Sequence, residues 1–274
     1  PKRGAQREEL SEILKDDSIE YNFQINKEMM LKTMLSKTNL IVLIEGVFTN
    51  VFLGSLTILF LPYIQGEPHN FAPFTTAVFL ASFGLIAGIL GKIILARLSD
   101  KLCYDKEIRR LYFIIFALAI GAFSFVFMFY LPLPHLTIIE GKDIIYFFSF
   151  PTIWIMGAIY LSANSISSLY DVNQQPLLQE INLPEAQGQI VSWNRLLENI
   201  GFGSGPLITG ILISISGQNY QIVALFIGLF TMPGIFLWIF AFKWYHRDKT
   251  VIKNILKQRA EIIKGNQKNN HKSK

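Results

Sequence analysis

The sequence predicts an all-α membrane protein built as a bundle of six transmembrane helices. Hydrophobic residues make up 51% of its 274 residues, and the mean hydropathy is +0.37. Mostly apolar runs of about 18 or more residues recur along the chain, and each is long enough to cross a hydrocarbon layer of about 30 Å. A soluble domain does not need apolar runs of that length, so soluble globular classes are excluded.

The order of the segments follows from where the apolar runs start and stop. Residues 1–36 are polar and are expected to form a cytosolic segment, residues 37–242 to form the membrane bundle, and residues 243–274 to form a basic cytosolic tail. Pro62 is expected to close the first span, and Pro151 to interrupt the fourth. The six expected spans are about 38–64, 74–98, 111–131, 144–170, 188–215 and 221–242.

The positive charges predict the orientation of these spans. Of the 25 Lys and Arg residues, seven lie in 1–37, five in 97–110 and ten from 243 onward, whereas Lys142 alone falls in the opposite set of loops. Because cytoplasmic loops are enriched in Lys and Arg, we expect both ends of this chain in the cytoplasm, with the protein integral to the cell (plasma) membrane. The chain begins at Pro1 rather than Met, so we expect a further segment upstream.

Composition also narrows the partners and the chemistry. The net charge of +5 does not indicate a nucleic-acid partner, because the basic residues flank apolar spans instead of forming one patch. Cys103 is the single cysteine, so no disulfide framework or thiolate metal site is expected. We expect no cofactor and no metal; the expected partners are the lipid bilayer and a small-molecule substrate.

Charged and amide side chains inside the apolar spans are the first candidate site, because such residues are costly in lipid and are functional by default. The candidates for substrate or coupling contacts are Glu45, Asn50, Arg195, Glu198 and Asn199. We expect Glu45 to pair with Arg195 across the bundle, with Glu198 as the alternative partner of Arg195. A carboxyl coupled to transport, a polar contact to substrate and a plain internal ion pair remain open readings.

Small residues in the same spans predict close helix contacts and a bend. The first and second spans carry them at spacings of four or eight residues, and the fifth span combines them with a proline. In the fifth span we expect them to lie deep in the membrane, where a partner bundle packs. The residues expected to serve packing or a hinge are Gly46, Gly54, Gly84, Gly88, Gly201, Gly203, Gly205, Pro206 and Gly210.

Two cytosolic motifs resemble those of the major facilitator superfamily. PKRGAQREEL resembles the start of the loop that joins the two six-helix halves of that family. ARLSDKLCYDKEIRR resembles its short basic loop, Gly-x-Leu-Ala-Asp-Arg-x-Gly-Arg. Leu98, Ser99, Asp100 and Lys101 match that loop in type, while Ala96 and Cys103 stand where glycines are usual.

The fifth span carries the rest of the resemblance. LPEAQGQIVSWN is similar to the family's Pro-x-x-x-Arg-Gly approach to its eleventh helix, with Pro184 and Gly188 present and Gln187 in place of the arginine. NIGFGSGPLITGILI resembles the glycine-rich part of that helix, and within the superfamily these stretches look most like the spinster-like group.

The resemblance implies a fold and a function. The six spans would correspond to helices seven to twelve, the C-terminal half of a transporter whose partner is an N-terminal six-helix half or a second copy. It implies secondary active transport of a small solute by alternating access, coupled to protons or another ion, with an amphiphilic substrate. Asp100 would be a latch capping a neighbouring helix, and Lys101, Arg109 and Arg110 would pair with acidic groups to complete a gating loop.

Two other classes are weighed against transport. A six-span scaffold or sensor that moves no solute, assembled from half-size chains, would be separated from a transporter by solute flux in vesicles. An intramembrane hydrolase could use Ser204 of GFGSGP, but His69, His135, His246 and His271 all fall in loops or tails, so no Ser–His pair is expected inside the membrane. We therefore expect no catalytic residues and no enzyme.

Overall fold

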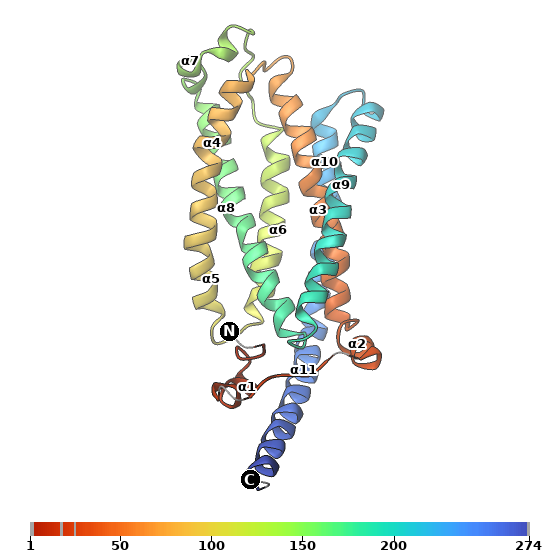
Figure 1. Cartoon of the computed structure of the whole chain (residues 1–274). Coiled ribbons are helices and arrows are strands. Elements are labelled where there is room, and N and C mark those ends of the chain that lie inside the picture. The colour runs from red at the N-terminus through yellow and green to blue at the C-terminus, as the bar shows by residue number, and fades with distance from the viewer. Residues whose placement is uncertain (1–2, 17–18, 25, 273–274) are drawn as a thin grey trace.

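The structure, a computed structural model, describes residues 3–16, 19–24 and 26–272, with side chains up to residue 265. Within these residues every regular element is a helix, which confirms the all-α class. The long helices run side by side as one bundle (Figure 1), and both ends of the chain lie at the same end of it. We call this end of the bundle the terminal end and the opposite one the far end.

Five segments of the described chain are long and apolar enough to cross a membrane, as judged by length and composition. This number of apolar helices indicates an integral membrane protein. The five segments are Lys37–Gln65, Pro73–Cys103, Arg109–Met128, Gln187–Ile215 and Tyr220–Gly265.

The expected fourth span does not belong to this set. Helix α8 runs over Pro151–Glu180 and packs between α4 (Pro73–Ile89) and α6 (Arg109–Met128), with Trp154 and Ile155 exposed on its other face. Its serine, amide and acidic side chains give it less apolar content than the five segments above. Pro151 begins α8 instead of interrupting it, because the missing N–H of proline costs nothing in a first helical turn. A separate short helix, α7 (Ile144–Phe148), precedes it.

The tightest packing in the bundle joins α3 (Lys37–Gln65) to α9 (Gln187–Ile215), which lie next to each other in Figure 1. A Cβ atom on Gly54 would overlap the backbone of Phe202, and one on Gly201 would lie 2.5 Å from the carbonyl oxygen of Val47. Gly205 meets α3 in the same way, at Ser55. The two backbones therefore touch directly, as small residues allow in membrane helices.

Helix α4 continues through the π-helical segment η2 (Leu90–Leu95) into α5 (Ala96–Cys103). At Gly91 in η2, a Cβ would lie 2.7 Å from the carbonyl oxygen of Ser165, so η2 contacts the backbone of α8. Single-turn π segments inside α-helices are frequently found at functional sites, and η2 is such a segment in contact with α8.

The last two helices are α10 (Tyr220–Phe230) and α11 (Met232–Lys272). Whereas the last span was expected to end at residue 242, α11 continues without interruption for 41 residues. At about 1.5 Å per residue it is about 60 Å long, so its second half projects beyond the bundle at the terminal end (Figure 1).

The N-terminal segment lies against this projecting part. It contains α1 (Glu8–Ser11), the 3₁₀ turn η1 (Ile13–Lys15) and α2 (Lys27–Thr33), while a second 3₁₀ turn, η3 (Glu140–Lys142), lies at the far end. Leu10, Leu14 and Tyr21 are buried in one apolar cluster with Leu256 of α11. A second apolar cluster fills the far half of the bundle around Phe79 and other aromatic rings, so the core runs the length of the bundle.

Candidate functional site

A fully buried carboxyl group lies inside the bundle, about two helical turns into α3 from the terminal end. Glu45 of α3 has no exposed surface, and its Oε2 accepts a hydrogen bond of 2.8 Å from the hydroxyl of Tyr170 in α8. Its Oε1 accepts a second bond from the hydroxyl of Thr49, one helical turn away. The Tyr170 oxygen in turn accepts a bond of 2.8 Å from Gln174 Nε2, which fixes the ring in place.

No Lys or Arg forms an ion pair with Glu45 among the residues that the structure describes. The expected pairing of Glu45 with Arg195 is therefore wrong. Arg195 instead binds Glu198 at 2.7 Å, three residues along the same helix, which is the alternative pairing. The physical reason is that residues three apart share one face of a helix, so Arg195 reaches Glu198 without crossing the bundle.

The second buried carboxyl lies next to the first. Glu198 accepts a bond of 2.6 Å from Asn194 and occupies the space beside Gly46, where a Cβ would lie 3.2 Å from its Cγ. A Cβ on Gly234 of α11 would lie 3.4 Å from Cγ of Glu45. Two glycines thus make room for two carboxyl groups on neighbouring helices.

Two adjoining cavities open beside this pair, between α3, α6 and α8. Their volumes are about 280 and 210 Å³. Thr49 and Tyr170, the two hydroxyl donors to Glu45, form part of the wall of the smaller one. We call the two cavities together the α3–α6–α8 crevice. Five residues line both of its parts: Phe52, Leu53, Gly121, Asn164 and Ser167.

The two remaining amide candidates lie elsewhere. Asn50 donates a bond of 2.8 Å to the carbonyl oxygen of Gly46 in its own helix and packs against Gly201 of α9. Asn199 is exposed on the outer surface of α9. The structure therefore brings Glu45 and Glu198 together and leaves these two amides at the edge of the site.

The loop expected to act as a gate forms a different contact from the one predicted. Asp100 lies inside α5 and binds Arg110 at 3.2 Å, so it caps no helix N-terminus. Arg109 donates to the carbonyl oxygen of Leu102, and Lys101 is exposed. The reason is that α5 extends past Asp100 to Cys103, so the aspartate is part of a helix and not of a loop.

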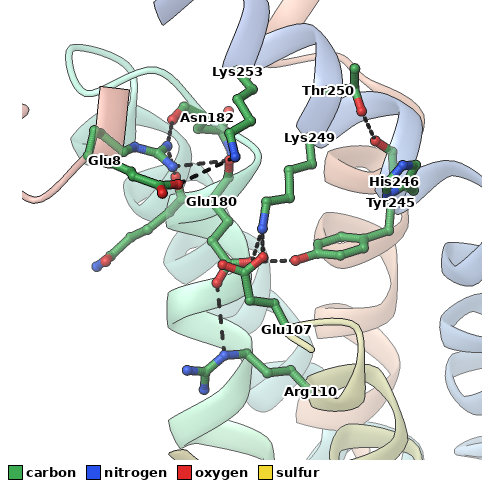
Figure 2. Close-up of polar contacts among 12 residues, drawn as sticks. Glu8, Glu107, Arg110, Glu180, Asn182, Tyr245, His246, Lys249, Thr250 and Lys253 are labelled. Atoms are coloured by element: carbon green, nitrogen blue, oxygen red, sulfur yellow. Dashed lines mark hydrogen bonds and ion pairs between the residues drawn. The ribbon is translucent and has the colours of Figure 1, made fainter. Parts of the chain in front are cut away.

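A charged cluster at the terminal end joins that loop to α8 and α11. Figure 2 shows Arg110, Tyr245 and Lys249 converging on the carboxylates of Glu107 and Glu180. Arg110 lies 3.9 Å from Glu180, and Lys249 lies 3.8 Å from the same carboxylate. The end of α8 is therefore tied both to the start of α6 and to α11.

Sequence reasoning missed this cluster and the hydroxyl donors to Glu45. Glu180, Tyr245 and Lys249 lie in segments that look like ordinary polar flanks, and only the packing of α8 against α11 brings them together. Thr49 could have been found, because it lies four residues from Glu45 on the same helical face. Tyr170 gave no such signal, since its partner is 125 residues away.

Some of the candidate glycines face a neighbouring helix closely, and others have no neighbour. Gly54, Gly201 and Gly205 serve the α3–α9 contact, and Gly84 meets the ring of Tyr160 at 3.4 Å. The expectation that the glycines of α9 meet a partner bundle therefore fails for Gly201 and Gly205, which pack on α3. At the remaining glycine candidates, no described atom lies within 4 Å of the position that a Cβ would take: Gly88, Gly203 and Gly210.

No family model matches this chain, and no curated protein or solved structure is significantly similar to it. The described residues contain no group of three or more His, Cys, Asp or Glu side chains placed to hold a metal ion.

Proposed function

We propose that this chain is a six-helix half of a secondary active transporter, in which Glu45 binds and releases the coupling proton. In this proposal α8 is the sixth membrane helix, packed between α4 and α6. The resemblance of its motifs to the major facilitator superfamily, and to the spinster-like group, supports the proposal that this chain is the C-terminal half of such a transporter. The Lys and Arg distribution supports placing both ends of the chain on the cytoplasmic side of the plasma membrane.

The observation that carries the proposal is the environment of Glu45. An ionised carboxylate removed from water and lacking a cation is strongly destabilised, and binding a proton relieves that cost. The hydroxyl groups of Thr49 and Tyr170 can bind Glu45 whether it is ionised or protonated. A hydroxyl group can donate to a carboxylate or accept from a carboxylic acid. Glu198 differs, since Arg195 neutralises it in place. Of the two carboxyls, Glu45 is therefore the one fitted to change its protonation state.

The neighbours of Glu45 connect it to both the crevice and the helices that would move. Tyr170 lies on α8, which is tied at the terminal end to α6 and α11. A change in the charge of Glu45 alters the bond that joins α3 to α8. Rocking of one bundle against its partner half, N-terminal or a second copy, would then expose the crevice to one side at a time.

The test is solute uptake into vesicles that contain the purified chain together with its partner half or as assembled copies. An imposed pH gradient should drive uptake of at least one member of a panel of small amphiphilic solutes. Glu45→Gln should abolish the dependence on the gradient, because the amide cannot exchange a proton, and Glu198→Gln should weaken it. Glu12→Gln, an exposed residue of the N-terminal segment, is the matched control. Gradient-driven uptake that persists unchanged in both variants would sink the proposal.

If the unaltered protein moves no solute, the scaffold or sensor reading is favoured. That outcome is separable from poor folding, because circular dichroism of the same vesicles reports the helix content of the chain.

A further inference from the structure

The α3–α6–α8 crevice has an aromatic end and a polar end. At the aromatic end, Phe52 and Phe125 meet edge to face with ring centroids 5.3 Å apart, and Phe60 and Tyr160 stack at 6.3 Å. Met128 adds a flexible thioether to the same wall. Cavities that are mostly apolar and carry a few placed polar groups are the usual binding sites for small molecules.

The polar end carries one sign of charge. Among the described residues that line the two cavities, Asp171 is the single charged side chain, and it is joined there by the amide of Asn164 and the hydroxyl of Ser167. In the described part of the chain, no Lys or Arg lines either cavity. The cations that act on Asp171, Lys92 and Arg195, lie outside the lining, and Arg195 is already bound to Glu198.

We propose that the crevice binds a lipophilic amine, with its apolar body among the aromatic rings and its ammonium group at Asp171 and Asn164. The aromatic faces carry a negative quadrupole that attracts a cation, and the carboxylate supplies a counterion at the one polar end. A carboxylate ligand of the same shape would meet Asp171 with like charge and no compensating cation in the described wall. This inference rests on the proposed function and names the substrate class of that same site.

The position of Glu45 gives the bound amine a role in coupling. Thr49 and Tyr170 line the same cavity as Asp171 and donate to Glu45, so their hydroxyl groups lie between that cavity and the buried carboxyl. A cation bound in the cavity stabilises ionised Glu45. Entry of the amine therefore favours release of the proton, and binding of a proton favours release of the amine, which is an exchange of one for the other.

The test compares three ligands that share one phenylbutyl body: 4-phenylbutylamine, 4-phenylbutan-1-ol and 4-phenylbutyrate. Binding to the full chain in lipid nanodiscs is measured by saturation-transfer NMR, with competition to obtain affinities. We expect the amine to bind at least about tenfold more tightly than the carboxylate, a difference of about 1.4 kcal/mol. Asp171→Asn should bring the amine down to the affinity of the alcohol while leaving the alcohol unchanged.

A steric variant tests the location. Gly121 lines both cavities, and Gly121→Leu should fill the crevice and weaken binding of all three ligands by about tenfold. Gly210→Leu is the matched control, because nothing lies within 4 Å of a Cβ at that position. If Gly121→Leu fails to fold, Leu53→Trp takes its place, because Leu53 lines both cavities and is partly exposed. Equal binding of amine and carboxylate, or amine binding unaffected by the filling variant, would overturn the inference.

The outcomes also separate this inference from the proposed function. Selective amine binding without gradient-driven flux would leave the crevice assignment standing and remove the transport proposal. Glu45-dependent flux of other solutes without amine binding would leave transport standing and remove the substrate class.

Discussion

The carboxylate of Asp248 in α11 accepts two hydrogen bonds from Thr38, one from its backbone N–H at 2.9 Å and one from its hydroxyl at 2.7 Å. Thr38 lies in the first turn of α3, where backbone N–H groups have no partner within the helix. Both side chains are buried. Helix α11 thus supplies a negatively charged cap to α3 from 210 residues away.

Removing this cap should destabilise the fold. We expect Asp248→Ala to lower the free energy of unfolding by about 1–2 kcal/mol, because two donors and the positive end of α3 lose their acceptor. Asp248→Asn should cost less, since its oxygen still accepts. Unfolding in mixed SDS micelles measures both. Glu261→Ala, an exposed change on the same helix, should have no effect, and an equal loss there would show that the cap is not the cause.

The contact between α3 and α9 predicts opposite effects for two pairs of glycines. Gly54→Ala and Gly205→Ala should each cost about 1–3 kcal/mol, since the new Cβ would overlap the backbone of the facing helix. Gly203→Ala and Gly210→Ala should instead gain up to about 1 kcal/mol, because nothing lies within 4 Å and alanine favours the helix. Thermal unfolding of the four variants measures this. The same sign at all four positions would contradict the close packing.

The ion pair between Arg259 and Glu185 should matter more than the exposed pairs around it. It is buried, with side chains 7% and 3% exposed and 2.6 Å apart, and Tyr21 donates to the same carboxylate at 2.9 Å. Burial raises the pKa of Tyr21, so its hydroxyl stays a neutral donor.

Glu185→Ala should cost about 3–5 kcal/mol by leaving a buried guanidinium unpaired, and the double change with Arg259→Ala should cost less than the sum of the two. The exposed Lys253–Glu8 pair supplies the control, and Glu8→Ala should cost less than about 1 kcal/mol. Chemical unfolding gives all four values. An additive double change would mean that the pair contributes nothing as a pair.

His69, in the loop between α3 and α4, should make stability depend on pH. Its Nδ1 lies 3.1 Å from the carbonyl oxygen of Pro134, and its ring meets that of Tyr63 at 5.0 Å. Burial lowers the pKa of His69 from its ordinary value of 6.5. The Pro134 carbonyl opposes this with a smaller raising effect on that pKa, and the proximity of His135 adds a still smaller lowering one.

The direction of the pH dependence follows from whether the folded or the unfolded chain binds the proton more tightly at His69. Below pH 6.5 the unfolded chain protonates His69 more readily than the folded one, so the free energy of unfolding falls as the pH drops from there. His69→Gln should remove this part of the acid sensitivity, and Tm measured at pH 8 and pH 5 tests it. The exposed His246→Gln is the control, and an equal flattening by both would assign the effect elsewhere.

The sequence was sufficient for the helical membrane class, because that class depends on length and apolar content. The sequence also predicted the bounds of α9 to within one residue: the helix runs over Gln187–Ile215, and 188–215 was expected. It could not rank the partners of Arg195, because a pair within one helix and a pair across the bundle have the same residue types. The rotation of α9 that decides between them is set by glycine contacts with α3, which need both helices to be seen.

The same limit applies to α8, which begins at Pro151 where an interruption of the fourth span was expected. Its polar residues suggested a span with a serine-rich end, yet the role of each depends on which neighbouring element it faces. Asn173 shows this, since it accepts from Ser99 at 2.8 Å and from Arg110 at 3.2 Å. A helix surrounded by protein can carry groups that a helix facing lipid cannot.

The uninterrupted length of α11 has a mechanical consequence. Helix α11, about 60 Å long, begins beside Glu45, caps α3 with Asp248, packs against the N-terminal segment near Leu256 and continues beyond it to Lys272. A small tilt at the membrane end of such a helix becomes a larger displacement at its outer end. The N-terminal segment packs on this outer part of α11 and is also bonded to the loop between α8 and α9, through Tyr21 and Glu185. A pair of spin labels, one on that segment and one on α3, would record a tilt of α11 as a change in distance.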